Sequence, residues 1–258
     1  MIEKSPINPT HLNPGEARIG SLYSLPDLLT EFRIDPDAVL KPFGLSVAFF
    51  QNPDNTIEFS TFGDLIQSCV SQTQCPHFGL LVGMSNKISG LGSTGILASA
   101  APAVGDALNS LINNYDLHNR AAQPFLNTTE KTATFGFKIF DSDIVGAAHV
   151  FEGAIAMACN VMRGLCGPGW TAQEVTFCHA MPADIEVYQR FFKAPLRFNA
   201  EINALNFPSS TLLAEADSAD GILFRHMLKY IYRQRSNAEI GSHARILRII
   251  DSLIRSQN

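Results

Sequence analysis

A long, largely apolar helix constrains this chain more than any other feature of its sequence. Residues 150–166, VFEGAIAMACNVMRGLC, place apolar side chains on most sides of the helix that their spacing predicts. The turn Gly167-Pro168-Gly169 then ends that helix. A helix that is apolar on most sides has to be buried, so we expect the rest of the fold to surround it.

Shorter helices and strands flank this segment on both sides. Residues 132–140 and 172–179 are rich in β-branched and aromatic side chains, which predicts strands, and one or two more are expected within 196–207. Residues 101–119 and 185–192 predict helices. This order permits right-handed βαβ units, but the gaps between the strands favour an α+β fold, with a small, mostly antiparallel sheet packed by several long helices.

Helix signals also occur near both ends of the chain. Asp35-Pro36 is typical of a capped helix start, and Gly44 follows that short helix where a terminating glycine belongs. At the other end, residues 221–236 and 242–256 each carry an apolar stripe at helical spacing. The sequence therefore predicts a flexible N-terminal arm (1–21), an α+β body (22–220) and a helical C-terminal tail (221–258).

Charge is distributed unevenly along the chain. Residues 1–220 hold 12 Lys and Arg against 22 Asp and Glu, a net of −10, whereas residues 221–258 hold 7 against 2, a net of +5. An acidic body with a basic tail indicates that only the tail approaches a polyanion such as nucleic acid. A solvated basic helix is the plainer interpretation of the same run.

The sequence shows neither a membrane span nor a secretion signal. No run of about 18 uninterrupted apolar residues occurs, and the polar, Pro-rich N-terminus lacks the apolar region of a signal peptide. The five cysteines are odd in number and form no Cys-x-x-Cys pair, which indicates reduced, mostly buried thiols. We therefore expect a cytoplasmic protein with no membrane partner.

Motifs for cofactors and catalysis are weak. Gly90-Leu91-Gly92-Ser93-Thr94-Gly95 matches the dinucleotide-binding pattern, but polar residues precede it and the expected helix begins only near Ala101, so a flexible glycine turn is favoured. The histidines do not pair at metal-ligand spacing, and Cys178 and His179 are predicted to lie on opposite faces of a strand. We expect no cofactor, no metal and no enzymatic activity.

Two long segments carry a family resemblance. They are GLGSTGILASAAPAVGDALNSLINNYDLHN at 90–119 and GLCGPGWTAQEVTFCHAMPADIEVYQRFFKAPLRFNAEINALNFPSSTLLAEADSAD at 164–220. Both resemble the effector domain at the N-terminus of AraC-type transcription regulators, in the subgroup of ornithine and virulence regulators. That domain is often labelled arabinose-binding. The resemblance covers residues 22–220 and is strongest in the second half.

The resemblance implies an organisation and a set of partners. Residues 22–220 would sense a small-molecule effector, aromatic or fatty in character, and the protein would act as a homodimer. Residues 221–258 would form a helical linker and the first helix of a truncated DNA-binding region. Because no recognition helix is found, DNA would be contacted only through a missing C-terminal helix-turn-helix domain.

Candidate effector-binding residues come from the large and hydrogen-bonding side chains of the central segment. A ligand pocket is mostly apolar, with a few placed polar groups, although a plain core explains buried aromatic residues equally well. The candidates are Tyr115, His118, Phe135, Phe137, Trp170, Phe177, His179 and Met181.

Two other functions remain open at this point. An α+β enzyme would use Cys178 with His179, or Asp143, although no third orienting group is evident. A dimerisation module without a ligand would instead have a fully packed core.

Overall fold

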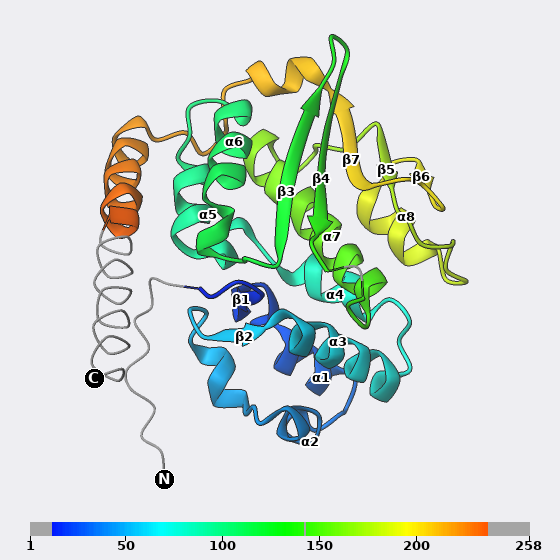
Figure 1. The fold of residues 1–258 in the computed structure, drawn as a ribbon. Helices are drawn as coiled ribbons and strands as arrows, with labels where there is room; N and C mark the ends of the chain where they lie inside the picture. Colours follow the sequence, from blue (N-terminus) through cyan, green and yellow to red (C-terminus); the bar gives the residue numbers. More distant parts are fainter. Residues whose placement is uncertain (1–11, 142, 237–258) are drawn as a thin grey trace, which may run out of the picture.

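The structure, a computed structural model, describes residues 12–141 and 143–236. It has an α+β fold, as the sequence predicts, with a five-stranded sheet in the order β3-β4-β7-β5-β6 (Figure 1). Neighbouring strands are antiparallel except β5 and β6, which are parallel. The strands are β3 (Ala122–Thr128), β4 (Thr132–Ile139), β7 (Asn203–Pro208), β5 (Glu174–Thr176) and β6 (Leu196–Arg197).

The long apolar helix α7 (Ala147–Cys166) lies at the centre of the molecule, as predicted. It packs against β4 and β7 of the sheet and also contacts helices of the N-terminal part (Figure 1). Its buried side chains include Ile155, Met162 and Leu165, which belong to the main hydrophobic core together with Phe135 and Phe207 of the sheet.

Residues 12–85 form a separate layer with its own core. A two-stranded antiparallel sheet, β1 (Glu16–Arg18) and β2 (Thr56–Glu58), accompanies the helices α1 (Leu25–Glu31), α2 (Pro36–Leu40), α3 (Phe59–Thr73) and α4 (Phe78–Ser85). The predicted cap of α2 is present, since the Asp35 side chain accepts a hydrogen bond from the Asp37 amide. Gly44 has φ 70°, the left-handed conformation for which glycine is suited.

Glycines allow α4 and α7 to cross at backbone contact. A Cβ placed on Gly79 would lie 2.2 Å from the carbonyl oxygen of His149, and one on Gly83 would lie 2.2 Å from that of Gly153. No side chain fits at such distances, so the spacing Gly79-x-x-x-Gly83 sets how closely the two helices approach. This crossing joins the N-terminal layer to the central helix.

One expectation for the middle of the chain is wrong, and one strand of the structure was not predicted. The glycine-rich segment at 90–95 is not a turn, because it belongs to the 3-10 helix Ile88–Leu91 and to α5 (Gly92–Ser99), which precedes α6 (Val104–Asn114). The sequence analysis predicts no strand at 122–128, where the structure has β3 with Pro124 in it. Proline is tolerated there because β3 is an edge strand that pairs only with β4.

The ends of the described chain complete the fold. Residues 12–21, assigned to the arm by sequence, include β1, and the side chains of Leu12, Ala17 and Ile19 are buried. After α8 (Glu186–Phe192) and a 3-10 helix at Ser209–Leu213, residues 221–236 are helical as predicted. The helix predicted at 242–256 lies outside the described residues, and the division of the chain into three parts stays a prediction.

Candidate functional site: an apolar cavity beside the central helix

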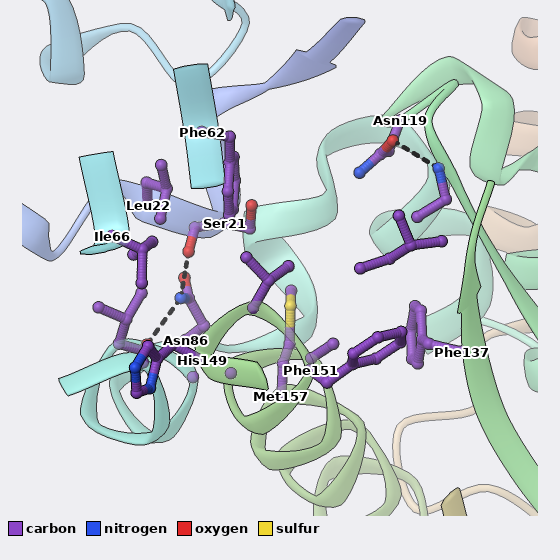
Figure 2. Close-up of a pocket in the computed structure, with 18 of the residues that line it drawn as sticks. Ser21, Leu22, Phe62, Ile66, Asn86, Asn119, Phe137, His149, Phe151 and Met157 are labelled. Carbon is purple, nitrogen blue, oxygen red and sulfur yellow. Dashed lines mark hydrogen bonds between the residues drawn. The ribbon is translucent and has the colours of Figure 1, made fainter. Parts of the chain in front are cut away.

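A cavity of about 60 Å³ lies between the N-terminal layer and α7 (Figure 2). Helix α3 supplies one wall, α4 and α7 meet at another, and β4 closes the cavity from the sheet. Most of the wall is apolar. The larger apolar lining residues are Leu22, Phe59, Phe62, Ile66, Val82, Phe137, Ile139, Val150, Phe151 and Met157.

The helix crossing helps to form this cavity. Gly79, Gly83 and Gly153 all line it, and each lacks a side chain that would otherwise occupy space where α4 and α7 meet. Met157 and Phe151 of α7 extend toward the space in Figure 2. The cavity is therefore bounded by the glycine contact of α4 and α7 and by side chains of α7.

Asn86 is the most unusual polar residue of the wall. Its side chain is 1% exposed, and its Nδ2 donates hydrogen bonds to the carbonyl oxygens of Ser21 (2.5 Å) and Val82 (2.8 Å), as Figure 2 shows. Its Oδ1 has no hydrogen-bond partner among the residues that the structure describes. A buried acceptor without a partner is energetically costly, which makes Asn86 unusual among the lining residues.

Asn119 supplies a second polar side chain, but its oxygen is already engaged. The Oδ1 accepts hydrogen bonds from the backbone amides of Ala121 (2.7 Å) and Ala122 (3.0 Å), which fixes the start of β3. Asn119 thus shapes the wall, whereas the acceptor of Asn86 has no partner among the described residues.

A buried polar cluster adjoins the cavity at His149. The carboxylate of Glu152, which is 3% exposed, lies 3.2 Å from Nδ1 of His149 and accepts a hydrogen bond from the Tyr188 hydroxyl at 2.5 Å. His179 Nε2 lies 3.3 Å from the same carboxylate but is not aligned for a hydrogen bond. Burial, followed by the charge of Glu152, raises the pKa of Tyr188, so this hydroxyl stays protonated and donates.

Four of the predicted residues, from the turn after α6 and from β4, gather in one aromatic group. The Tyr115 ring lies 5.6 Å from the His118 ring and 5.7 Å from the Phe137 ring, and Phe135 lies 5.9 Å from Phe137. Tyr115 and Phe137 line the cavity, whereas Phe135 and His118 are buried beside it. Burial, and then the charge of Arg18, lowers the pKa of His118 to about 3, so the ring is neutral near neutral pH.

The other four candidates lie elsewhere. Phe177 is fully buried, and its ring lies 5.2 Å from the His179 ring and 6.0 Å from the Tyr188 ring. Trp170 lines a separate groove, and Met181 is 64% exposed. The eight residues were predicted as one site, but the fold distributes them over a cavity wall, a polar cluster and the surface. Whether any of the eight binds an effector stays a prediction.

Sequence reasoning did not single out the residues that define the cavity. Asn86, Phe62 and Ile66 lie in or next to helices of the N-terminal layer, and their local pattern is that of ordinary core residues. One signal was available, since Gly79 and Gly83 are spaced four apart in an otherwise apolar helix. That spacing is typical of close helix contact.

The enzymatic alternative finds little support in the thiols. Cys178 is exposed, and partial burial raises the pKa of its thiol, which disfavours the reactive thiolate. Burial likewise raises the pKa of Cys159 and of Cys166 to about 11. Within residues 12–141 and 143–236, no group of three or more His, Cys, Asp or Glu side chains is placed to hold a metal ion.

The cavity is connected to the C-terminal helix through two consecutive residues. Tyr115 lines the cavity, and its neighbour Asp116 binds Arg235, whose Nη2 and Nη1 lie 2.5 and 3.2 Å from the two carboxylate oxygens. Arg235 Nη2 also donates to the carbonyl oxygen of Asn113 at 3.0 Å. The helix at 221–236 is thus tied to the end of α6.

The fold and the sequence together define the class of this protein. A family model described as the arabinose-binding domain of AraC transcription regulators, N-terminal, matches residues 34–215. The chain belongs to this family of N-terminal domains of AraC-type transcription regulators, as the resemblance at 22–220 implied.

Individual regulators resemble the chain more distantly. It is 22% identical over 219 residues to the HTH-type transcriptional regulator VirS of Mycobacterium tuberculosis, covering 84% of this chain and 64% of that protein. It is 24% identical over 191 residues to the ornithine utilization regulator of Pseudomonas aeruginosa, covering 73% and 56%. The chain thus spans less than two thirds of the length of these relatives.

A solved structure has the same fold. The transcriptional regulator CdpR from Pseudomonas aeruginosa superposes with a TM-score of 0.63 at 18% identity, over 83% of this chain and 65% of that one. Among the described helices of the present structure, none combines the length and the apolar character that a membrane crossing needs.

Proposed function

We propose that this chain is the effector-sensing part of an AraC-type regulator, and that the cavity beside α7 is the effector site. The observation that carries the proposal is a buried, mostly apolar cavity whose wall holds the unpartnered acceptor of Asn86. The effector would be a small, largely apolar molecule, aromatic or fatty, with an N–H or O–H group that donates to this oxygen.

The size of the cavity implies that binding changes the structure. An engineered cavity that takes up benzene has a volume of about 150 Å³, and the cavity here has about 60 Å³. An effector of benzene size or larger must therefore displace lining side chains such as Met157 or Tyr115. Binding would then shift the population toward a wider arrangement.

Displacement of Tyr115 would reach the C-terminal helix. Asp116 follows Tyr115 directly and holds Arg235, so a shift of this turn would loosen or reorient the helix at 221–236. In a full-length regulator this helix would lead to a DNA-binding domain, through which the protein would control transcription in the cytoplasm. We also propose a homodimer, because Ile222, Tyr230 and Tyr232 of this helix expose large apolar side chains, as interfaces often do.

A cavity-filling variant tests the proposal. Ala154 lines the cavity, so Ala154→Leu should fill it, whereas Ala38→Leu adds the same atoms to an exposed position of α2. A thermal-shift screen would cover fatty acids, aromatic acids, amino acids and nucleotides. Binding to the folded state raises stability by about 2.7 kcal/mol at a hundredfold excess over Kd.

The expected result is a stabilising compound whose effect is kept by Ala38→Leu and lost by Ala154→Leu. An Asn86→Leu variant should also lose it, since the acceptor is removed. If Ala154→Leu is as stable as the parent and responds equally to the compound, the effector does not bind in this cavity. A fully unresponsive parent protein would favour the ligand-free dimerisation module.

A further inference from the structure

A second, open groove of about 510 Å³ borders α7 and α8. Its wall comes from α7, from the loop that follows α7 and from α8, with Met84 of α4 at its edge. Two aromatic residues, Trp170 and Phe191, line it. Its volume falls in the range of small-molecule sites, which is roughly 300–1,000 Å³.

The groove carries positive charge in an otherwise acidic body. Its lining includes Arg163, Arg190 and Lys193 and no carboxylate. Residues 1–220 have a net charge of −10 and only 12 Lys and Arg, so a quarter of those cations meet here. Among the described residues, Arg190 and Lys193 form no ion pair, whereas Arg197 on the neighbouring β6 is paired with Glu174.

Part of the groove is held in place without a ligand. The guanidinium of Arg163 lies over the Phe191 ring at 4.7 Å, and its Nη2 donates to the Phe191 carbonyl oxygen at 2.6 Å. The Trp170 ring packs edge-on against Phe207 at 5.8 Å. A fixed cation next to fixed aromatic faces binds with little loss of side-chain entropy.

We propose that this groove binds a small anion with a flat apolar part, of the class of aromatic carboxylates and phosphates. The anionic group lies among Arg163, Arg190 and Lys193, and the apolar part lies against Trp170 and Phe191. This site is separate from the effector cavity, since the two share no lining residue. The protein therefore takes two ligands of different chemistry.

The groove contains its own reporter. Trp170 is the one tryptophan of the chain, so tryptophan fluorescence reports on this groove and not on the cavity. The protein would be titrated with phenyl phosphate, and separately with benzyl alcohol, with inorganic phosphate and with a short DNA duplex of random sequence. The variant Arg190→Gln/Lys193→Gln removes two exposed charges, and Arg197→Gln removes one charge outside the groove as the control.

We expect phenyl phosphate to change Trp170 fluorescence saturably, and the double variant to weaken binding about tenfold. Benzyl alcohol and inorganic phosphate should each bind more weakly than phenyl phosphate, and Arg197→Gln should bind it like the parent. No saturable change with phenyl phosphate, or equal binding of benzyl alcohol, would overturn the proposal. A duplex that displaces phenyl phosphate would instead assign the groove to a nucleic-acid backbone.

Discussion

Arg235 forms a bidentate ion pair with Asp116, in which Nη2 and Nη1 donate to the two carboxylate oxygens at 2.5 and 3.2 Å. The two residues are far apart in the sequence, and the pair joins the helix at 221–236 to the turn after α6. Since Tyr115 of that turn lines the cavity, the pair lies between the candidate effector site and the C-terminal helix. Both side chains are partly exposed, so the ion pair contributes little to the free energy of unfolding. Its importance is that it connects the cavity to the helix.

Breaking this pair should uncouple the helix from the cavity while leaving the fold intact. We expect Arg235→Gln to lower the free energy of unfolding by at most about 1 kcal/mol, because exposed ion pairs contribute little. Hydrogen exchange of residues 221–236 should increase and should no longer respond to a cavity ligand. Arg225→Gln, on the same helix and exposed, is the control and should exchange like the parent. Unchanged protection in Arg235→Gln would show that other contacts hold the helix.

The glycine crossing of α4 and α7 predicts opposite effects for two similar substitutions. Gly83→Ala places a methyl group 2.2 Å from the Gly153 carbonyl oxygen, so the helices must separate, and we expect a loss of about 1–3 kcal/mol. Gly164→Ala in α7 meets no atom within 4 Å and should stabilise by roughly 0.5–1 kcal/mol through helix propensity. Urea unfolding measures both values. Equal effects of the two substitutions would mean that α4 and α7 do not touch at Gly83.

Burial of neutral His118 predicts a loss of stability in acid. Its pKa is lowered to about 3 in the folded protein, from an ordinary value near 6.5, so only the unfolded chain takes up the proton between these values. This contribution is complete above pH 6.5 and is lost as the pH falls toward 3, by about 1.4 kcal/mol per pH unit at most.

A variant without the titrating ring should lack this slope. His118→Phe is expected to show a flatter fall of unfolding free energy between pH 6.5 and pH 4 than the parent, measured by urea unfolding at each pH. His226→Gln, which changes an exposed histidine, should keep the slope of the parent. A parental slope in His118→Phe would show that the acid sensitivity arises from groups other than His118.

Much of the local structure followed from short-range patterns. The apolar run of α7, the Asp35-Pro36 start of α2 and the β-branched run of β4 each occur where the sequence indicates them. These elements are decided by neighbours in the chain, through side-chain spacing and capping. Strand β3 and helix α5 were not predicted, and they contain residues that usually break such elements, Pro124 in β3 and glycines in α5. An edge position and close packing override them here.

The cavity could not be predicted from local sequence patterns. Its wall joins Ser21 and Leu22 to Asn86 and then to residues of β4 and α7, and no local pattern marks these positions as neighbours. Of the eight candidates, Tyr115 and Phe137 reach the wall, while Trp170 lines the basic groove and Met181 is exposed. Aromatic composition predicts that a hydrophobic core exists. It does not predict which aromatic rings border a cavity within that core.

By itself, the sequence determined the α+β class, the buried central helix, the membership in the AraC-type family and the acidic body with a basic tail. The class, the central helix and the charge pattern follow from periodicity, composition and charge, whereas the family follows from the resemblance of residues 22–220 and from the family model that matches residues 34–215. Only the tertiary structure decided that Asn86 is left with an unpartnered acceptor, that Arg235 meets Asp116, and that three cations share a groove with Trp170. Such relationships depend on packing between distant segments, where an ångström of approach decides whether a contact or a cavity forms.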